Sequence, residues 1–319
     1  MIECYEIFEK KLKKLSSELF SSTQVIWCNL VNPNDFELES ISKAHNINLD
    51  DLKDCLDITE RPIFSFDRIL NTQHILIRVI ESNEIDLKAN TSPTKPLGIF
   101  ISENNKLITI SKFNLIQEDF FNFASKTEFF SYLQVLFTLL KYLISKCDKL
   151  AFKIALKIDE VQEKILKASK VTAISEPFKL NSYIILFNSA MIDDSRVLKS
   201  YYNHNKNNFS DSPIINEIIE DLIIDFEQVA SYSSILRDLL ANAMDAFASV
   251  INNNLSQVMK VVGSISLILM IPTLIASYYG MNIELPFANT GILAFWGIII
   301  LSIVLSIFSL IIFRRRNWL

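Results

Sequence analysis

Residues 261–283 read VVGSISLILMIPTLIASYYGMNI, which is 23 consecutive uncharged positions between Lys260 and Glu284. A helix needs roughly 20 apolar residues to cross a bilayer core about 30 Å thick. A second uncharged run has an apolar core of 22 residues, Ile292–Phe313, and it stops at Arg314-Arg315-Arg316. Because backbone polar groups in lipid must find partners within their own segment, two such runs predict a pair of membrane-spanning helices. The alternative is a pair of buried helices in a soluble protein, but such runs are normally shorter.

Charge at the ends of the two runs predicts their orientation. Lys260 precedes the first run and three arginines follow the second, whereas the loop between them carries only Glu284. The positive-inside rule then places both termini in the cytoplasm and the short loop outside. Residues 1–15 are rich in Glu and Lys and lack the apolar segment of a signal peptide. We therefore expect a multi-pass protein of a prokaryotic plasma (inner) membrane, with roughly the first 255 residues in the cytoplasm.

Composition limits the function classes. Without residues 258–319, the chain retains 27 basic and 35 acidic side chains, a net charge of −8. An acidic cytoplasmic body argues against nucleic acid as the partner and is compatible with cations. No nucleophile elbow, P-loop or dinucleotide fingerprint is present, so the sequence predicts neither an enzyme nor an organic cofactor.

The four cysteines of the chain are scattered along it. Their spacing does not match that of a zinc site, and a reducing cytoplasm disfavours disulfides. They are therefore expected to be buried thiols: Cys4, Cys28, Cys55 and Cys147.

The N-terminal part predicts a cytoplasmic α/β domain over residues 1–127. Residues 1–22 carry apolar side chains at helical spacing and predict an amphipathic helix. Short helices are expected from near Phe36 and over Leu49–Leu56. Four or five strands are expected, some of them parallel, and their order stays open. The runs are Val25–Leu30, Ile63–Phe66, Ile75–Ile80, Leu97–Ile101 and Leu107–Ile110, with a linker at Asn90–Pro96.

Long helices are predicted after residue 128. Two of them cover residues 129–170 and 177–202, and a polar connection follows at Asn203–Asp211. From Pro213 no glycine or proline occurs until Gly263, so Pro213–Tyr279 predicts a single helix that enters the membrane. Two helices broken near residues 252–254 are the alternative. The expected regions are thus a helical stalk over residues 128–256 and a transmembrane domain over residues 257–319.

One face of the long helix carries polar or small side chains at steps of three and four residues. Several copies of such a helix around an axis would form a pore lined with hydroxyls. Alternatively, the hydroxyls satisfy nearby backbone groups or pack helix against helix, and the periodicity favours neither reading. The face consists of Asp245, Ser249, Asn252, Ser256, Met259, Val262, Ser266, Met270, Thr273 and Ser277.

The tetrapeptide Tyr279-Gly280-Met281-Asn282 ends the first span, and a short loop with Glu284 and Pro286 follows. The second span then ends in basic residues and Trp318-Leu319. This arrangement resembles the CorA family of magnesium channels, whose signature is Gly-Met-Asn at this site. The resemblance extends upstream through Met259-Lys260-Val261. It continues more weakly into the first 130 residues, at Trp27, Pro33 and Asp54–Pro62.

The resemblance implies a homopentameric funnel that conducts Mg²⁺, with the first spans lining the pore. Asn282 would stand at the outer mouth beside Glu284, and its side-chain carbonyl would bind the water shell of Mg²⁺, an ion that dehydrates reluctantly. Asp54 and Asp221 would bind a regulatory Mg²⁺ between subunits, and this ion would favour the closed state. Gly280 would allow a close backbone approach at the turn. The implied pore residues are Gly280, Met281, Asn282, Thr273, Met270, Ser266, Val262, Met259 and Ser256, with Asp245 as a ring in the stalk.

Two departures from the family pattern bear on selectivity. Ser256 stands where the family often has an asparagine at the inner end of the pore, and the basic C-terminal residues are arginines where lysines are more usual. Related transporters carry Co²⁺, Ni²⁺ or Zn²⁺, and the tripeptide alone does not exclude these ions. A membrane-tethered sensor or scaffold is the alternative from another functional class, although a simple anchor needs no hydroxyl face.

Overall fold

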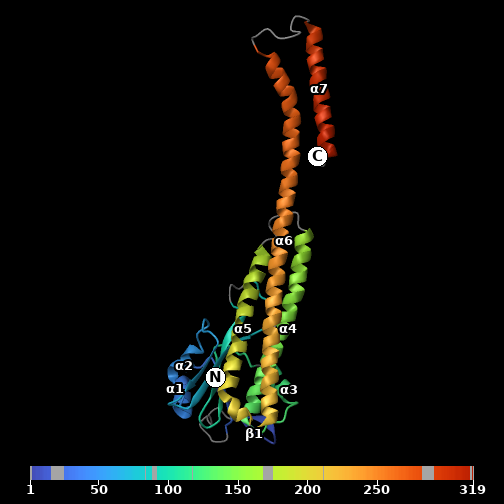
Figure 1. The fold of residues 1–319 in the computed structure, drawn as a ribbon. Helices are drawn as coiled ribbons and strands as arrows, with labels where there is room; N and C mark the ends of the chain where they lie inside the picture. The colour runs from blue at the N-terminus through green and yellow to red at the C-terminus, as the bar shows by residue number, and fades with distance from the viewer. Residues whose placement is uncertain are drawn as a thin grey trace. The chain divides into compact units, whose positions relative to one another are not determined.

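The computed structural model describes residues 2–15, 25–82, 84–87, 92–116, 118–167, 175–210, 212–281, 291–316 and 318. The chain forms two compact units, Met1–Ala243 and Met244–Leu319. One helix, α6 (Pro213–Tyr279), contributes residues to both units. The single helix predicted over Pro213–Tyr279 is therefore confirmed (Figure 1).

A seven-stranded sheet forms the centre of the first unit, in the order β2-β1-β3-β7-β6-β5-β4. The pairing of β3 with β7 is parallel and every other pairing is antiparallel, so the predicted parallel pairing is confirmed. All five predicted strands are present, and two further strands raise the total above the expected four or five. The strands are β1 (Ile2–Phe8), β2 (Lys11–Leu15), β3 (Trp27–Val31), β4 (Ile63–Asp67), β5 (Thr72–Ile80), β6 (Thr94–Ile101) and β7 (Leu107–Ser111).

The prediction of a helix at the N-terminus was wrong. Strands β1 and β2 form an antiparallel hairpin there, joined by Glu9 and Lys10 with positive φ angles of 48° and 62°. Glu6 lies opposite Lys13 in the hairpin. Opposite charges at facing positions stabilise the pairing of two antiparallel strands. In a segment this short, apolar residues fit the helical and the extended period almost equally well. The rest of the predicted helix, residues 16–22, lies outside the described residues.

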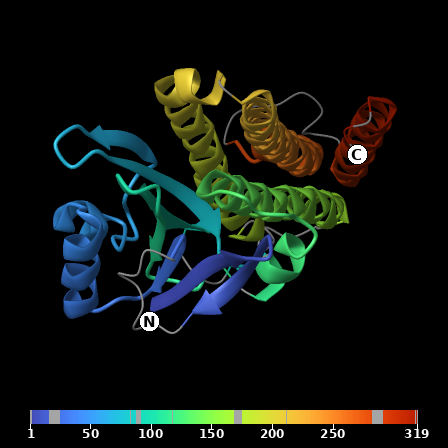
Figure 2. The same cartoon turned by 90° about the horizontal axis from the view of Figure 1, so that it is seen from below.

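Helices α1 (Asp35–His45) and α2 (Leu49–Asp54) cover one face of the sheet (Figure 2). Asn34 begins α1 with a capping box, in which its side chain accepts from the Glu37 N–H and the Glu37 carboxylate accepts from the Asn34 N–H. Such a cap satisfies two N–H groups that the first helical turn otherwise leaves unpaired. The apolar core beneath these helices includes Leu38, Ile41, Leu52, Cys55, Leu30, Phe100 and Ile108.

Helices α3 (Glu118–Ala124), α4 (Tyr132–Lys167) and α5 (Ser175–Ser210) lie on the other face of the sheet (Figures 1 and 2). The indole of Trp27 makes an edge contact with Phe120 of α3, and its N–H donates to the Thr109 hydroxyl at 2.9 Å. The short helix α3 was not predicted, because seven residues give too little periodicity to recognise.

Helix α5 continues to Ser210, so the polar connection predicted over residues 203–210 was wrong. Asn205 and Gln73 of β5 exchange two amide hydrogen bonds of 2.9 and 3.0 Å, and Asn205 is buried. Asparagine is common in turns, but here Asn205 lies within α5 and connects this helix to the sheet. The predicted linker at residues 90–96 was also wrong in part, since Thr94–Pro96 belong to β6.

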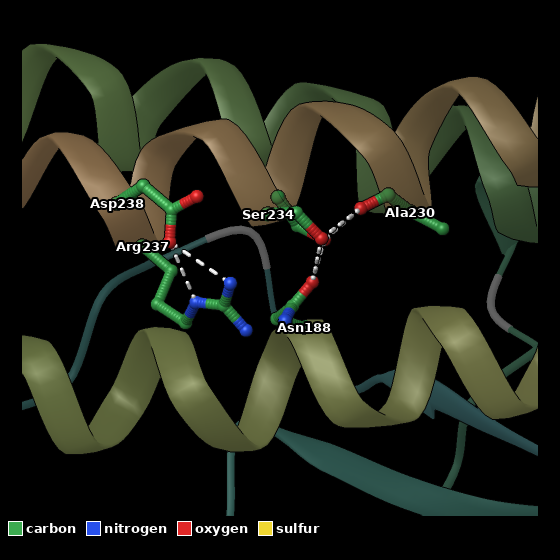
Figure 3. Close-up of polar contacts among 6 residues, drawn as sticks. Asn188, Ala230, Ser234, Arg237 and Asp238 are labelled. Carbon is green, nitrogen blue, oxygen red and sulfur yellow. Dashed lines mark hydrogen bonds and ion pairs between the residues drawn. The ribbon is translucent and has the colours of Figure 1, made fainter.

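A buried polar contact joins α5 to α6 within the first unit (Figure 3). The Ser233 and Ser234 hydroxyls lie 2.9 and 2.8 Å from Oδ1 of Asn188 and within 3.1 Å of the Ala230 carbonyl. Asn188 and Ser233 are buried. Because each hydroxyl has one proton, it can donate either to Asn188 or to the preceding turn of α6.

The second unit contains the C-terminal part of α6 and helix α7 (Ile292–Arg315). Among the described residues, α6 and Phe295–Arg315 are long and apolar enough to cross a membrane. An apolar groove of about 720 Å³ lies between them, and its walls include Ile268, Pro272, Ile299 and Ile303. The two predicted spans are thus present as helices, and α7 extends two residues beyond the predicted Phe313.

Candidate functional site

The predicted polar face of α6 is exposed in the single chain. The three apolar positions of this face, Met259, Val262 and Met270, are 63, 53 and 58% exposed. Ser266 and Thr273 are exposed as well, and so are Ser256 and Asp245. A face that combines large apolar side chains with hydroxyls, and that nothing in the second unit covers among the described residues, is suited to contact another molecule.

The hydroxyls of this face donate to their own helix. Ser266 Oγ donates to the Val262 carbonyl at 2.9 Å, and Thr273 Oγ1 donates to the Leu269 carbonyl at 3.0 Å. This is the local backbone bonding that we considered as an alternative to a pore lining. The two readings are nevertheless compatible, because a hydroxyl that has donated its proton still presents lone pairs as acceptors.

Helix α7 packs against the side of α6 that lies opposite the polar face. Ser264 is fully buried, and Ile268 and Pro272 line the groove toward α7. Successive residues of an α-helix are about 100° apart, so Val262 and Met270 lie roughly 160° from Ser264 and Ile268 respectively. The exposed polar face and the face toward α7 therefore lie on opposite sides of one helix.

The first two residues of the predicted filter, Gly280 and Met281, directly follow the last residue of α6, Tyr279. Gly280 donates its N–H to the Ala276 carbonyl at 2.9 Å, and Met281 donates to the Tyr278 carbonyl at 3.3 Å. A Cβ atom on Gly280 would stand 3.3 Å from the Ala276 carbonyl oxygen, which is a tight contact. Met281 is half exposed. Asn282 and Glu284 lie outside the described residues.

The two predicted regulatory carboxylates lie on different sides of the first unit. Asp54 is the last residue of α2, and Asp221 lies on α6. Both side chains are exposed. Helix α2 covers one face of the sheet, whereas α6 lies beside α5 on the other (Figures 1 and 2). One chain therefore does not bring Asp54 and Asp221 together, and within the described residues no group of three or more His, Cys, Asp or Glu side chains could hold a metal ion.

Other aspartates nonetheless lie near Asp54. Burial raises the pKa of Asp51, and the neighbouring carboxylates of Asp54, Asp67 and Asp50 raise that pKa further. A group of like charges that disfavours ionisation attracts a cation, because a divalent ion relieves the repulsion. Sequence reasoning singled out only Asp54 in this group. The spacing Asp50-Asp51-Asp54 on a short helix was the available signal, whereas Asp67 is brought close by the tertiary fold.

Sequence reasoning also missed a buried carboxyl group, Asp194 of α5. Its Oδ1 accepts from the backbone N–H of Arg78 at 2.8 Å, and its Oδ2 has no hydrogen-bond partner. Burial raises the pKa of Asp194 well above its usual range, although Arg78 opposes this effect. No sequence motif marks this residue, because the group that it binds is a backbone amide.

The model of the family described as CorA-like Mg²⁺ transporter protein matches residues 22–315. The cobalt/magnesium transport protein CorA of Methanocaldococcus jannaschii is 27% identical and covers 98% of this chain and 96% of its own. The magnesium transport protein CorA of Campylobacter jejuni is 24% identical, with 92% and 91% covered.

A solved structure has the same fold. The complete structure of the CorA magnesium transporter from M. jannaschii superimposes with a TM-score of 0.80 at 23% identity, and the match covers 100% of this chain and 99% of that one. The family match includes five of the seven strands of the first unit, β3 to β7, and the whole of α6 and α7. The chain belongs to the family of CorA-like Mg²⁺ transporter proteins.

Proposed function

We propose that the protein is a channel that carries Mg²⁺ into the cell across the plasma membrane. The observation that carries this proposal is the exposed polar face of α6, which lies opposite α7 on a helix long enough to span a bilayer. A lipid-facing helix has no use for such a face. The names of the relatives, which are magnesium or cobalt/magnesium transport proteins, support the same activity.

The pore is formed by the α6 helices of five subunits, with the α7 helices outside them. Met259, Val262 and Met270 narrow it, and the hydroxyls of Ser256, Ser266 and Thr273 offer acceptors to a hydrated ion. Because Mg²⁺ gives up its water reluctantly, neutral oxygen acceptors suit passage with much of the water shell retained. Asp245 adds a ring of carboxylates on the cytoplasmic side, which attracts cations.

The selectivity filter is formed by Gly280, Met281 and Asn282. In this proposal, the side-chain carbonyls of five Asn282 residues bind water molecules of the arriving ion, and Glu284 in the outer loop raises the local cation concentration. The tight contact at Gly280 supports a glycine there, because any Cβ would press on the Ala276 carbonyl.

Asp54 and Asp221 bind a regulatory Mg²⁺ between neighbouring subunits. The residues fit this ion, because both are exposed carboxylates, and Asp54 lies close enough to other aspartates to add to the rise that burial causes in the pKa of Asp51. Their separation within one chain is consistent with a site that only a second subunit completes. The bound ion would link subunits and favour the closed state.

The orientation follows from charge, with both termini and the first unit in the cytoplasm. The regions of the functional protein are the α/β domain (residues 1–127), the helical stalk (128–256) and the pore domain (257–319). Co²⁺ is the second candidate cargo, since the M. jannaschii relative is named a cobalt/magnesium transport protein. Ni²⁺ and Zn²⁺ have no comparable support in the relatives compared above.

The test is uptake into liposomes loaded with a Mg²⁺-sensitive dye. The parental protein should carry Mg²⁺, and Asn282→Ala should lose uptake while still inserting and assembling as a pentamer. Asn289→Ala is the matched control, because it removes the same amide from the same loop and should transport at the parental rate. Parental uptake by Asn282→Ala contradicts the filter, whereas a parental protein that carries neither Mg²⁺ nor Co²⁺ contradicts the transport function.

A further inference from the structure

Two cysteine thiols lie in contact in the first unit. Cys4 of β1 and Cys28 of β3 are directly opposite each other in the antiparallel register, and their Sγ atoms are 3.3 Å apart. Both side chains are buried. The other two cysteines, Cys55 and Cys147, are also buried, and among the described residues Cys55 contacts the Asp51 carbonyl and His74 rather than a thiol.

The strand geometry allows these two sulfurs to be joined. Directly opposite residues of antiparallel strands have Cα atoms about 4.5 or 5.5 Å apart, depending on the type of pair. Both separations fall within the range of about 4.4–6.8 Å that a disulfide spans. Side-chain rotation can therefore bring the two Sγ atoms to bonding distance without moving the strands apart.

The two thiols differ in acidity. A hydrogen bond from Cys28 lowers the pKa of Cys4, and the nearby Lys106 lowers it further. The same contact raises the pKa of Cys28, together with burial. By contrast, burial raises the pKa of Cys147 to about 12. Since the thiolate is the reactive form, Cys4 is the sulfur of this pair that reacts first with an oxidant.

We propose that Cys4 and Cys28 form a redox-responsive pair, which hydrogen peroxide converts into a disulfide that joins β1 to β3. The Cys4 thiolate attacks one peroxide oxygen, the O–O bond breaks, and the leaving hydroxide takes a proton to form water. Cys28 then attacks the Cys4 sulfenic acid, so that an S–S bond forms, the S–O bond breaks and a second water leaves. Two thiols lose two electrons in total, and the peroxide gains them.

The position of the pair in the sheet explains how an oxidant reaches it. On one side β1 pairs with β2, which is the edge strand of the sheet, and all five side chains of β2 are at least partly exposed. Edge elements open locally at a lower free-energy cost than central strands do. The pair is thus buried at rest and is reached when the N-terminal hairpin opens. In a reducing cytoplasm the thiols are free, and the disulfide forms as a response to peroxide.

Peptide mapping of the full-length protein tests this proposal. The detergent-solubilised protein is treated with hydrogen peroxide, alkylated after denaturation, digested and analysed by mass spectrometry. We expect a cross-linked peptide containing Cys4 and Cys28, lighter by the mass of two hydrogen atoms, while Cys55 and Cys147 remain alkylated. Folding holds the thiols together, so the pairing should be about tenfold or more faster than in protein unfolded in urea.

Two variants make the assignment specific. Cys28→Ser should stop at the Cys4 sulfenic acid, which a dimedone probe captures, whereas Cys147→Ser should form the disulfide as the parental protein does. The proposal is overturned if Cys4 and Cys28 both remain alkylatable after oxidation, or if either pairs with Cys55 or Cys147 at a comparable rate. The peptide mapping of the parental protein needs no variant, so it tests the proposal even if a variant misfolds.

Discussion

The backbone N–H of Arg78 donates to Oδ1 of Asp194 at 2.8 Å. Arg78 lies in the part of β5 that extends past the last residue paired with β4, Leu76. A strand amide that lacks a strand partner is thereby satisfied by a helix side chain. The Arg78 guanidinium points elsewhere, to the carbonyls of Ile58, Glu60 and Thr94 at 2.6–3.0 Å. One residue thus links the sheet to α5 through its backbone and to the loop before β4 through its side chain.

The buried carboxyl of Asp194 should make stability depend on pH. Its pKa in the folded state is raised by burial, while an unfolded aspartate titrates near pH 3.9. The folded state therefore holds a proton that the unfolded state loses, and stability falls as pH rises above about 4. Asp194→Asn keeps an acceptor for the Arg78 N–H and removes this titration. The stability of this variant relative to the parental protein should rise by on the order of 1–3 kcal/mol between pH 4 and pH 8.

Thermal unfolding followed by circular dichroism, at several pH values, measures this difference. Asp159→Asn is the matched control, because it makes the same change at an exposed position of α4, and its difference from the parental protein should vary little over the same range. A constant difference between Asp194→Asn and the parental protein would mean that Asp194 is ionised in the folded state.

Single cysteines test the polar face of α6. On the register of this helix, Met270→Cys and Val262→Cys should react with a small permeant thiol reagent or cross-link between subunits. Ile268→Cys and Ile275→Cys should do neither, because Ile268 lines the groove toward α7 and Ile275 lies on the same side of the helix. Reactivity is read by mass spectrometry against the parental protein, whose own cysteines are buried. Equal reactivity of the two pairs would show that the register is wrong.

Removing both regulatory carboxylates should remove inhibition by internal Mg²⁺. A ligand shifts an equilibrium only through its differential affinity for the two states, so Asp54→Asn with Asp221→Asn should conduct even at about millimolar Mg²⁺ on the cytoplasmic side. The dye assay above measures this at several internal concentrations.

The matched control for the regulatory site carries Glu103→Gln with Asp148→Asn, which removes the same charge from two exposed sites elsewhere on the first unit. This variant should keep the parental inhibition. If the Asp54/Asp221 variant is inhibited at the parental concentration, the regulatory site lies elsewhere, and Asp159, Glu160, Glu163 and Asp225 are the next residues to test.

Gly98 should not tolerate a side chain. A Cβ atom there would stand 2.2 Å from Sγ of Cys55 and 2.9 Å from Cγ2 of Ile110. Overpacking of this kind costs about 1–3 kcal/mol, so Gly98→Ala should lower the melting temperature. Adding Cys55→Ala removes the nearest atom and should restore part of the loss. Gly297→Ala, whose Cβ meets nothing within 4 Å, should melt no lower than the parental protein.

The strands and the long helix were predictable because their signals are local. Pro213–Tyr279 lacks any turn-like interruption before the span, and five short β-branched runs recur in the first unit. The errors arose where distant residues decide the local structure. Asn205 lies in a polar segment, and its hydrogen bonds with Gln73 come from a residue 132 positions away.

The candidate site divides in the same way. The polar face of α6 and the tripeptide after it could be predicted, since both follow from residues close together in the sequence. The acidic surface around Asp54 was predicted only in part, because Asp67 reaches it through the fold rather than through sequence spacing.

By itself, the sequence determined the two spans, the length of α6 and the side of that helix that carries the hydroxyls, because helical periodicity and hydrophobicity are properties of consecutive residues. Only the tertiary structure decided that the N-terminal segment is a hairpin, that Cys4 lies against Cys28, and that Asp194 is buried beneath the amide of Arg78. Each of these depends on strand order and helix docking. Those are set by contacts between residues far apart in the chain, and local sequence patterns do not encode them.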